Sequence, residues 1–173
     1  MNIFITLVCV LVSIYFTWKI TYKRQCQKKS EVKDQYNKYY HMYYTLEKWL
    51  EGAFSDRKIG LYIKKNNWNT VAIYGCGDIG RLLYRELEMN NVQVVCGIDK
   101  NTELSFPTKI VTPEKFSEKV DAVIVTSIAY FGEIEYVMSK ITEAEIISLE
   151  DIVYQNVYLS LIHISEPTRR VVI

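Results

Sequence analysis

The feature that most constrains the fold is a regular alternation of short apolar runs with helical segments between residues 70 and 148. No two-residue hairpin turn joins consecutive runs, and residues 122–125 read AVIV, a pattern typical of a strand buried on both faces of a parallel sheet. The sequence therefore predicts an α/β domain with a small, doubly wound parallel sheet. Strands are expected at 70–74, 92–98, 109–111, 121–126 and 145–148, and helices at 79–89, after 112 and at 131–141.

The turn after the first expected strand reads GCGDIG over residues 75–80, a G-x-G-x-x-G pattern between a strand and a helix. In a nucleotide-binding turn of this kind, Gly75 permits the tight turn, Gly77 lets the backbone approach a pyrophosphate, and Gly80 lets the helix pack on the strand. Backbone N–H groups at the helix start, including those of Asp78 and Ile79, are expected to hold the phosphate. The pattern predicts a Rossmann-like domain that binds a dinucleotide.

Polar residues at two further strand ends extend the expected site. Asp99 follows Gly80 by nineteen residues at the end of the second strand, from which a carboxylate accepts hydrogen bonds from ribose hydroxyls. That charge favours NAD over NADP, although the adjacent Lys100 weakens the preference. Thr126 and Ser127 end the fourth strand, where their hydroxyls are expected to contact a ligand. The alternative is a Rossmann-shaped domain that binds nothing, or another nucleotide-containing ligand such as a nucleotide-sugar.

Four segments, VAIYGCGDIGRLLYRELE, VVCGIDKN, VDAVIVTS and ISLEDIVY, carry a family resemblance. Together they resemble the Rossmann-like N-terminal domains of bacterial cell-surface polysaccharide and nucleotide-sugar proteins, including membrane-attached sugar dehydratases and epimerases. The resemblance covers residues 70–158 and implies a role in envelope glycan assembly. In the dehydratases a further catalytic domain follows. Two function classes therefore remain open: a nucleotide or nucleotide-sugar binding module, or the N-terminal fragment of a larger NAD-dependent dehydratase or epimerase.

No catalytic or metal-binding residue is assigned. Tyr136 and Lys140 have the spacing of the acid/base pair of short-chain dehydrogenases, but a chain with 14 tyrosines produces such pairs by chance, and Tyr136 is expected to be a half-buried packing residue. Residues 70–158 contain no histidine to activate Ser127, and no His and Cys cluster suited to zinc.

The N-terminal segment predicts a membrane anchor over residues 1–20. Residues 3–18 carry no charge and end in aromatic residues, as at a membrane interface. A cleaved signal peptide and a buried helix are the alternatives. The basic residues that follow predict a single-pass cell-membrane protein with its domain in the cytoplasm. They are Lys19, Lys23, Arg24, Lys28 and Lys29.

Residues 21–69 are interpreted as a basic flank and helical linker. Residues 31–51 contain neither Gly nor Pro. Their tyrosines and leucines recur at three- and four-residue steps, which indicates an amphipathic helix. Its tyrosine-rich face is expected to pack on the following domain or on a second copy in a homo-oligomer. Nucleic acid is excluded as a partner, because the formal net charge is +1 and no basic stripe accompanies the tyrosines.

The last fifteen residues, 159–173, resemble the translated sequence of a sequencing-library adapter. The native part of this sequence is therefore expected to stop at or near Tyr158, where the sequenced fragment ended; the alternative is a genuine C-terminal strand and tail. This segment is left out of the fold prediction.

Overall fold

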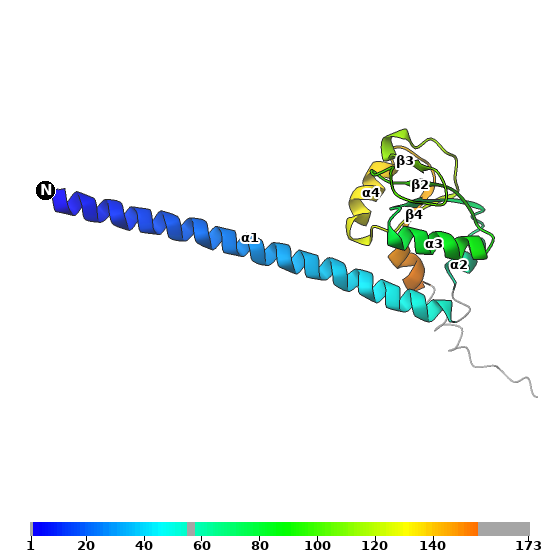
Figure 1. Cartoon of the computed structure of the whole chain (residues 1–173), viewed down its shortest axis with the longest axis horizontal. Coiled ribbons are helices and arrows are strands. Elements are labelled where there is room, and N and C mark those ends of the chain that lie inside the picture. The colour runs from blue at the N-terminus through cyan, green and yellow to red at the C-terminus, as the bar shows by residue number, and fades with distance from the viewer. Residues whose placement is uncertain (1, 55–57, 156–173) are drawn as a thin grey trace, which may run out of the picture. The chain divides into compact units, whose positions relative to one another are not determined.

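The computed structural model of the chain describes residues 2–54 and 58–155. The adapter-like tail therefore lies outside the described residues. The chain divides into two compact units, residues 1–40 and 41–173. The described part of the first unit consists of helix α1 (Asn2–Ala53), which continues into the second unit. The second unit contains the sheet and the remaining helices (Figure 1).

The second unit is built on a five-stranded parallel sheet. The strands are β1 (Thr70–Tyr74), β2 (Gln93–Ile98), β3 (Ile110–Val111), β4 (Ala122–Val125) and β5 (Glu145–Ser148). Their order across the sheet is β3-β2-β1-β4-β5, and every neighbouring pair is parallel. The predicted parallel α/β sheet is confirmed, and its strand order is consistent with a Rossmann-like fold.

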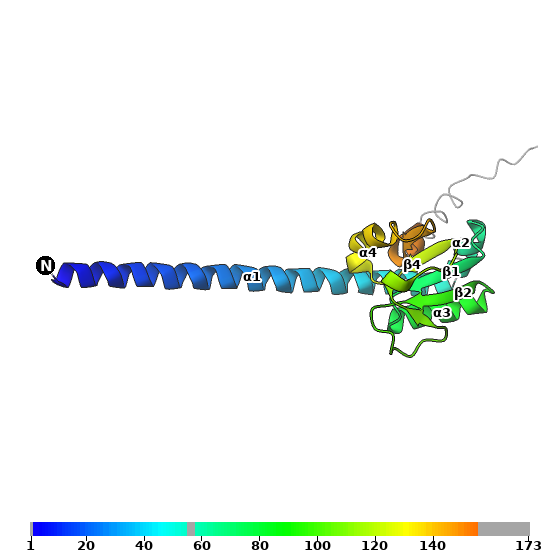
Figure 2. The same ribbon diagram turned by 90° about the horizontal axis from the view of Figure 1, so that it is seen from above.

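Both faces of the sheet are covered. Alternate residues of β1 and β4 point to opposite faces, as the two-residue period of a strand requires. Val71 belongs to the core that includes Leu83 of α3 (Asp78–Met89), whereas Ala72 belongs to the core that includes Met138 of α4 (Phe131–Met138). Helices α3 and α4 accordingly lie on opposite sides of the sheet (Figure 2). Residues 149–155 are helical and add Ile152 to the α3 side.

The end of α1 and the short helix α2 (Ile59–Lys65) are held to α3 by one carboxylate. Glu86 of α3 accepts hydrogen bonds from the Trp49 indole N–H and, at 2.6 Å, from the backbone N–H of Ile59. The second of these bonds satisfies a donor in the first turn of α2, which has no side-chain cap. The three helices are thereby tied together beside the sheet, and α2 lies next to α3 (Figure 1).

The predicted membrane anchor is wrong. Within residues 2–54 and 58–155, no helix combines the length and the apolar character that crossing a bilayer requires. The uncharged run of residues 3–18 would extend only about 24 Å at 1.5 Å per residue, which is less than the roughly 30 Å of a hydrocarbon core. The localisation inferred from that anchor, a single-pass protein with a cytoplasmic domain, is therefore withdrawn.

Two local predictions also differ from the structure. The sequence divided the N-terminal part into an anchor over residues 1–20 and an amphipathic helix over 31–51, whereas α1 is one continuous helix, because residues 19–51 contain neither Gly nor Pro. The helix expected after Thr112 is a single 3-10 turn, η1 (Pro113–Lys115), and the Thr112 side chain does not cap it.

Candidate functional site

The predicted site residues follow three neighbouring strands, β2, β1 and β4, and therefore lie along the carboxyl edge of the sheet. The chain proceeds from β1 to β2 and β3 on one side, and then to β4 on the other side of β1. The strand order thus reverses between β1 and β4. In open α/β sheets, the crevice outside the carboxyl ends of the strands at such a point is where ligands bind.

At two of the three glycines in the turn after β1, the backbone conformation or a close contact within the protein requires glycine. Gly75 has φ +98°, a left-handed conformation that favours glycine, and a Cβ there would overlap Thr126 Oγ1. A Cβ at Gly80 would overlap the Gly75 carbonyl oxygen, so glycine at 80 lets α3 start directly against the turn. The helix-packing role that the sequence assigned to Gly80 agrees with this contact.

Gly77 differs from both. Its φ is −71°, and a Cβ built on it would meet no atom within 4 Å. It is exposed, and it is the N-cap of α3 without a side-chain cap hydrogen bond. Within the described part of the chain, no acceptor pairs with the backbone N–H groups of Gly77, Asp78 or Ile79. The start of α3 therefore presents free amide donors beside open space.

Asp99 connects the end of β2 to the glycine turn. Its Oδ2 accepts a hydrogen bond from the Cys76 backbone N–H at 2.8 Å, and its Oδ1 accepts one from the Asn101 backbone N–H at 2.9 Å. The side chain is half-buried. Each carboxylate oxygen has a second lone pair, so the group can still accept from a ligand hydroxyl.

Thr126 and Ser127, at the end of β4, face the glycine turn in different ways. The Thr126 hydroxyl is within 3.1 Å of the Tyr74 carbonyl oxygen and 2.9 Å of the Gly75 carbonyl oxygen, so its proton is donated to the backbone of the turn. The Ser127 hydroxyl lies 3.0 Å from the position a Gly75 Cβ would take, and has no hydrogen-bond partner within residues 58–155. Ser127 therefore has the freer hydroxyl for a ligand.

Charged side chains border this edge. Asp78 and Lys100 are exposed, and the guanidinium of Arg81 pairs with the Asp78 carboxylate. This pair offsets a negative charge that would otherwise oppose a phosphate at the start of α3.

Cys76, inside the turn, is a feature whose role the sequence did not indicate. Its side chain is buried, and burial together with the nearby Asp99 charge raises the pKa of its thiol to about 12. The thiol is therefore protonated at neutral pH and is unsuited to act as a nucleophile. The contribution of this residue to the site is its backbone N–H, which holds Asp99.

Tyr136 and Lys140 form a surface contact. Lys140 Nζ lies 3.6 Å from the centroid of the Tyr136 ring, and the Tyr136 side chain is 65% exposed. The expectation that Tyr136 is half-buried is wrong, because it lies on the outer side of a helix whose inner residues are Ile134 and Met138. In the described residues, no group of three His, Cys, Asp or Glu side chains is arranged to hold a metal ion.

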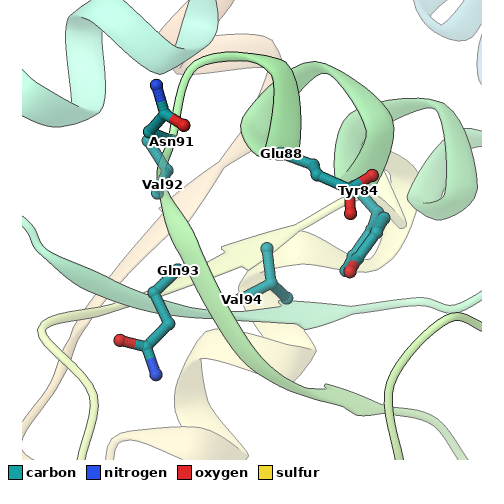
Figure 3. Close-up of a pocket in the computed structure, with 6 residues that line it drawn as sticks. All are labelled: Tyr84, Glu88, Asn91, Val92, Gln93 and Val94. Atoms are coloured by element: carbon teal, nitrogen blue, oxygen red, sulfur yellow. The ribbon is translucent and has the colours of Figure 1, made fainter.

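A separate hollow lies at the amino end of β2. It is lined by Tyr84 and Glu88 from α3, by residues 91 and 92, and by Gln93 and Val94 of β2 (Figure 3). Because ligands of parallel α/β sheets bind at the carboxyl edge, this hollow is distinct from the candidate site.

Comparisons with protein-family models, with curated proteins and with solved structures found no match for the chain.

Proposed function

We propose that the carboxyl edge of the sheet, between the turn after β1 and the end of β4, binds the phosphates of NAD or of a nucleotide-sugar. The phosphates would accept hydrogen bonds from the free backbone N–H groups at the start of α3. Such groups, together with the positive end of the helix dipole, favour an anion. A binding role suits the residues present, since the thiol of the turn is protonated at neutral pH and residues 70–158 contain no histidine that could activate Ser127.

The observation that carries the proposal is the contrast between Gly77 and its two neighbouring glycines. Gly75 and Gly80 are explained by backbone conformation and by a close contact within the protein. Nothing within the described protein requires glycine at 77, because its φ suits any residue and its Cβ direction is open. A ligand phosphate close to the backbone would explain it.

Asp99 supports NAD over NADP within this proposal. Its oxygens already accept hydrogen bonds from two backbone N–H groups, which orient the side chain at the end of β2. A carboxylate so placed can accept hydrogen bonds from ribose hydroxyls, whereas it would repel a 2′-phosphate. The role in cell-surface polysaccharide assembly depends on the sequence resemblance alone and is proposed on that basis.

Calorimetric titration of the full chain with NAD, NADP and a UDP-sugar tests the proposal. Gly77→Val should weaken binding of the preferred ligand by at least about tenfold, because the added side chain occupies the phosphate position. Gln93→Val is the matched control, since it adds the same side chain at an exposed position at the amino end of β2. Absence of heat with every ligand, or equal affinity of the wild type and Gly77→Val, would contradict it.

A further inference from the structure

The part of α1 within the first unit carries a heptad pattern. From residue 15 to residue 39, one side of the helix is marked by positions that alternate three and four residues apart, and we call these eight positions the seam. Two of them, Gln25 and Lys29, are polar. The other six are apolar or aromatic and are 57–67% exposed: Tyr15, Trp18, Tyr22, Val32, Tyr36 and Tyr39.

A seam of this kind needs a second helix. Repetition every 3.5 residues keeps the same side chains facing a partner only when two helices wind around each other with a left-handed supercoil. Charged residues occupy positions off the seam, among them Lys23, Glu31 and Asp34. In an isolated helix this side packs only within itself, as where Trp18 stacks on Tyr22, whereas packing between elements provides most of the stability of helices in proteins.

A depression on this helix indicates what kind of partner fits. It is lined by Lys28, Lys29, Val32, Lys33 and Tyr36. If Lys29 and Tyr36 are a positions of the heptad, Val32 is d and Lys33 is e. In a parallel coiled coil, these four positions surround the hole that receives a d side chain of the facing helix. Val32 of a second copy has that position.

We propose that residues 15–39 of α1 form a parallel, in-register, two-stranded coiled coil with the same residues of a second copy of this chain. Gln25 and Lys29 then form polar layers between aromatic ones. Polar residues at such positions fix register and strand number at a cost in stability.

Sedimentation equilibrium of the full chain tests whether two copies associate. The wild type should be a dimer, and Tyr22→Asp should raise the dimer dissociation constant by at least about a hundredfold, because two carboxylates would face each other next to the Trp18 layer of the seam. Ile20→Asp is the matched control: Ile20 is also exposed on α1 but lies off the seam, so its substitution should leave the dimer intact. A monomeric wild type, or equal effects of the two substitutions, would overturn the proposal.

Disulfide formation tests the parallel register. In a Cys9→Ser, Cys26→Ser background, Val32→Cys should give a disulfide-linked dimer on oxidation, because two d positions in register bring the sulfurs within bonding reach. Ile20→Cys should not, because its side chain points away from the partner. A dimer in which Val32→Cys fails to cross-link would overturn the parallel arrangement.

Discussion

The Asp99 carboxylate accepts a 2.8 Å hydrogen bond from the backbone N–H of Cys76, and so fixes the end of β2 to the glycine turn after β1. The two residues are 23 positions apart in the sequence. The carboxylate that we expect to meet the ribose therefore also shapes the turn expected to meet the phosphate.

Replacing Asp99 should lower stability as well as affinity. We expect Asp99→Ala to reduce the free energy of unfolding by about 1.5–3 kcal/mol, since it removes the charged acceptor of a partly buried hydrogen bond from the Cys76 backbone N–H. Urea unfolding of the two proteins measures this difference. Glu103→Ala, an exposed carboxylate nearby in the sequence, should change it by less than about 0.5 kcal/mol. Equal effects of the two substitutions would show that the hydrogen bond from Cys76 to Asp99 does not contribute to the free energy of unfolding.

Substitutions of the turn glycines should differ in their effect on the stability of the domain. We expect Gly80→Ala to destabilise the domain by about 1–3 kcal/mol, because its methyl group would overlap a backbone oxygen that can move only with the turn. Gly77→Ala should be tolerated, since its Cβ direction is open. Thermal unfolding of both variants is the measurement. A strongly destabilised Gly77→Ala would mean that the protein itself needs glycine there, and would remove the main support for the phosphate site.

The cysteines should differ in reactivity. Cys26 is exposed, whereas Cys76 is buried and the pKa of its thiol is raised to about 12. At about pH 8 only one Cys76 thiol in ten thousand would be ionised, and the thiolate is the reactive form. Peptide mapping after brief iodoacetamide treatment should find Cys26 modified and Cys76 protected until denaturant is added. Rapid modification of Cys76 in the folded protein would contradict its burial.

The ionisation of Asp121 should make the free energy of unfolding depend on pH in the acidic range. Hydrogen bonds from the Thr70 and Asn69 backbone N–H groups lower the pKa of Asp121 below its ordinary value of 3.8. Its stabilising effect is therefore complete above about pH 4 and is lost as the pH falls through the lower pKa of the folded state. Asp121→Asn should be less stable than the wild type at neutral pH, and this difference should shrink as the pH falls below about 4. A difference that persists unchanged at low pH would exclude this cause.

The sheet could be predicted from the sequence because its signals are local. The apolar run AVIV, the glycine turn and the alternation of strands with helices each report on a few adjacent residues. The predicted ends of β1 and β5 agree with the structure, and those of β2, β3 and β4 differ by one residue.

The remaining features depend on contacts between distant residues. The bond between Asp99 and Cys76, and the joining of Trp49 and Ile59 by Glu86, arise only when the fold brings separate segments together. The N-terminal error had another origin. An uncharged run of sixteen residues indicates burial of apolar side chains, but a run of that length does not by itself identify a membrane as the environment.

The most direct test of the proposed site is an NMR titration that follows the backbone amide signals of the ¹⁵N-labelled chain as NAD or a UDP-sugar is added. We predict that the signals of Gly77, Asp78 and Ile79 shift with a single binding curve, together with that of Ser127, while Gln93 at the opposite edge of the sheet stays unchanged. If these amide signals stay fixed at saturating concentrations of every ligand, or if only residues at the amino edge respond, the carboxyl edge does not bind a nucleotide.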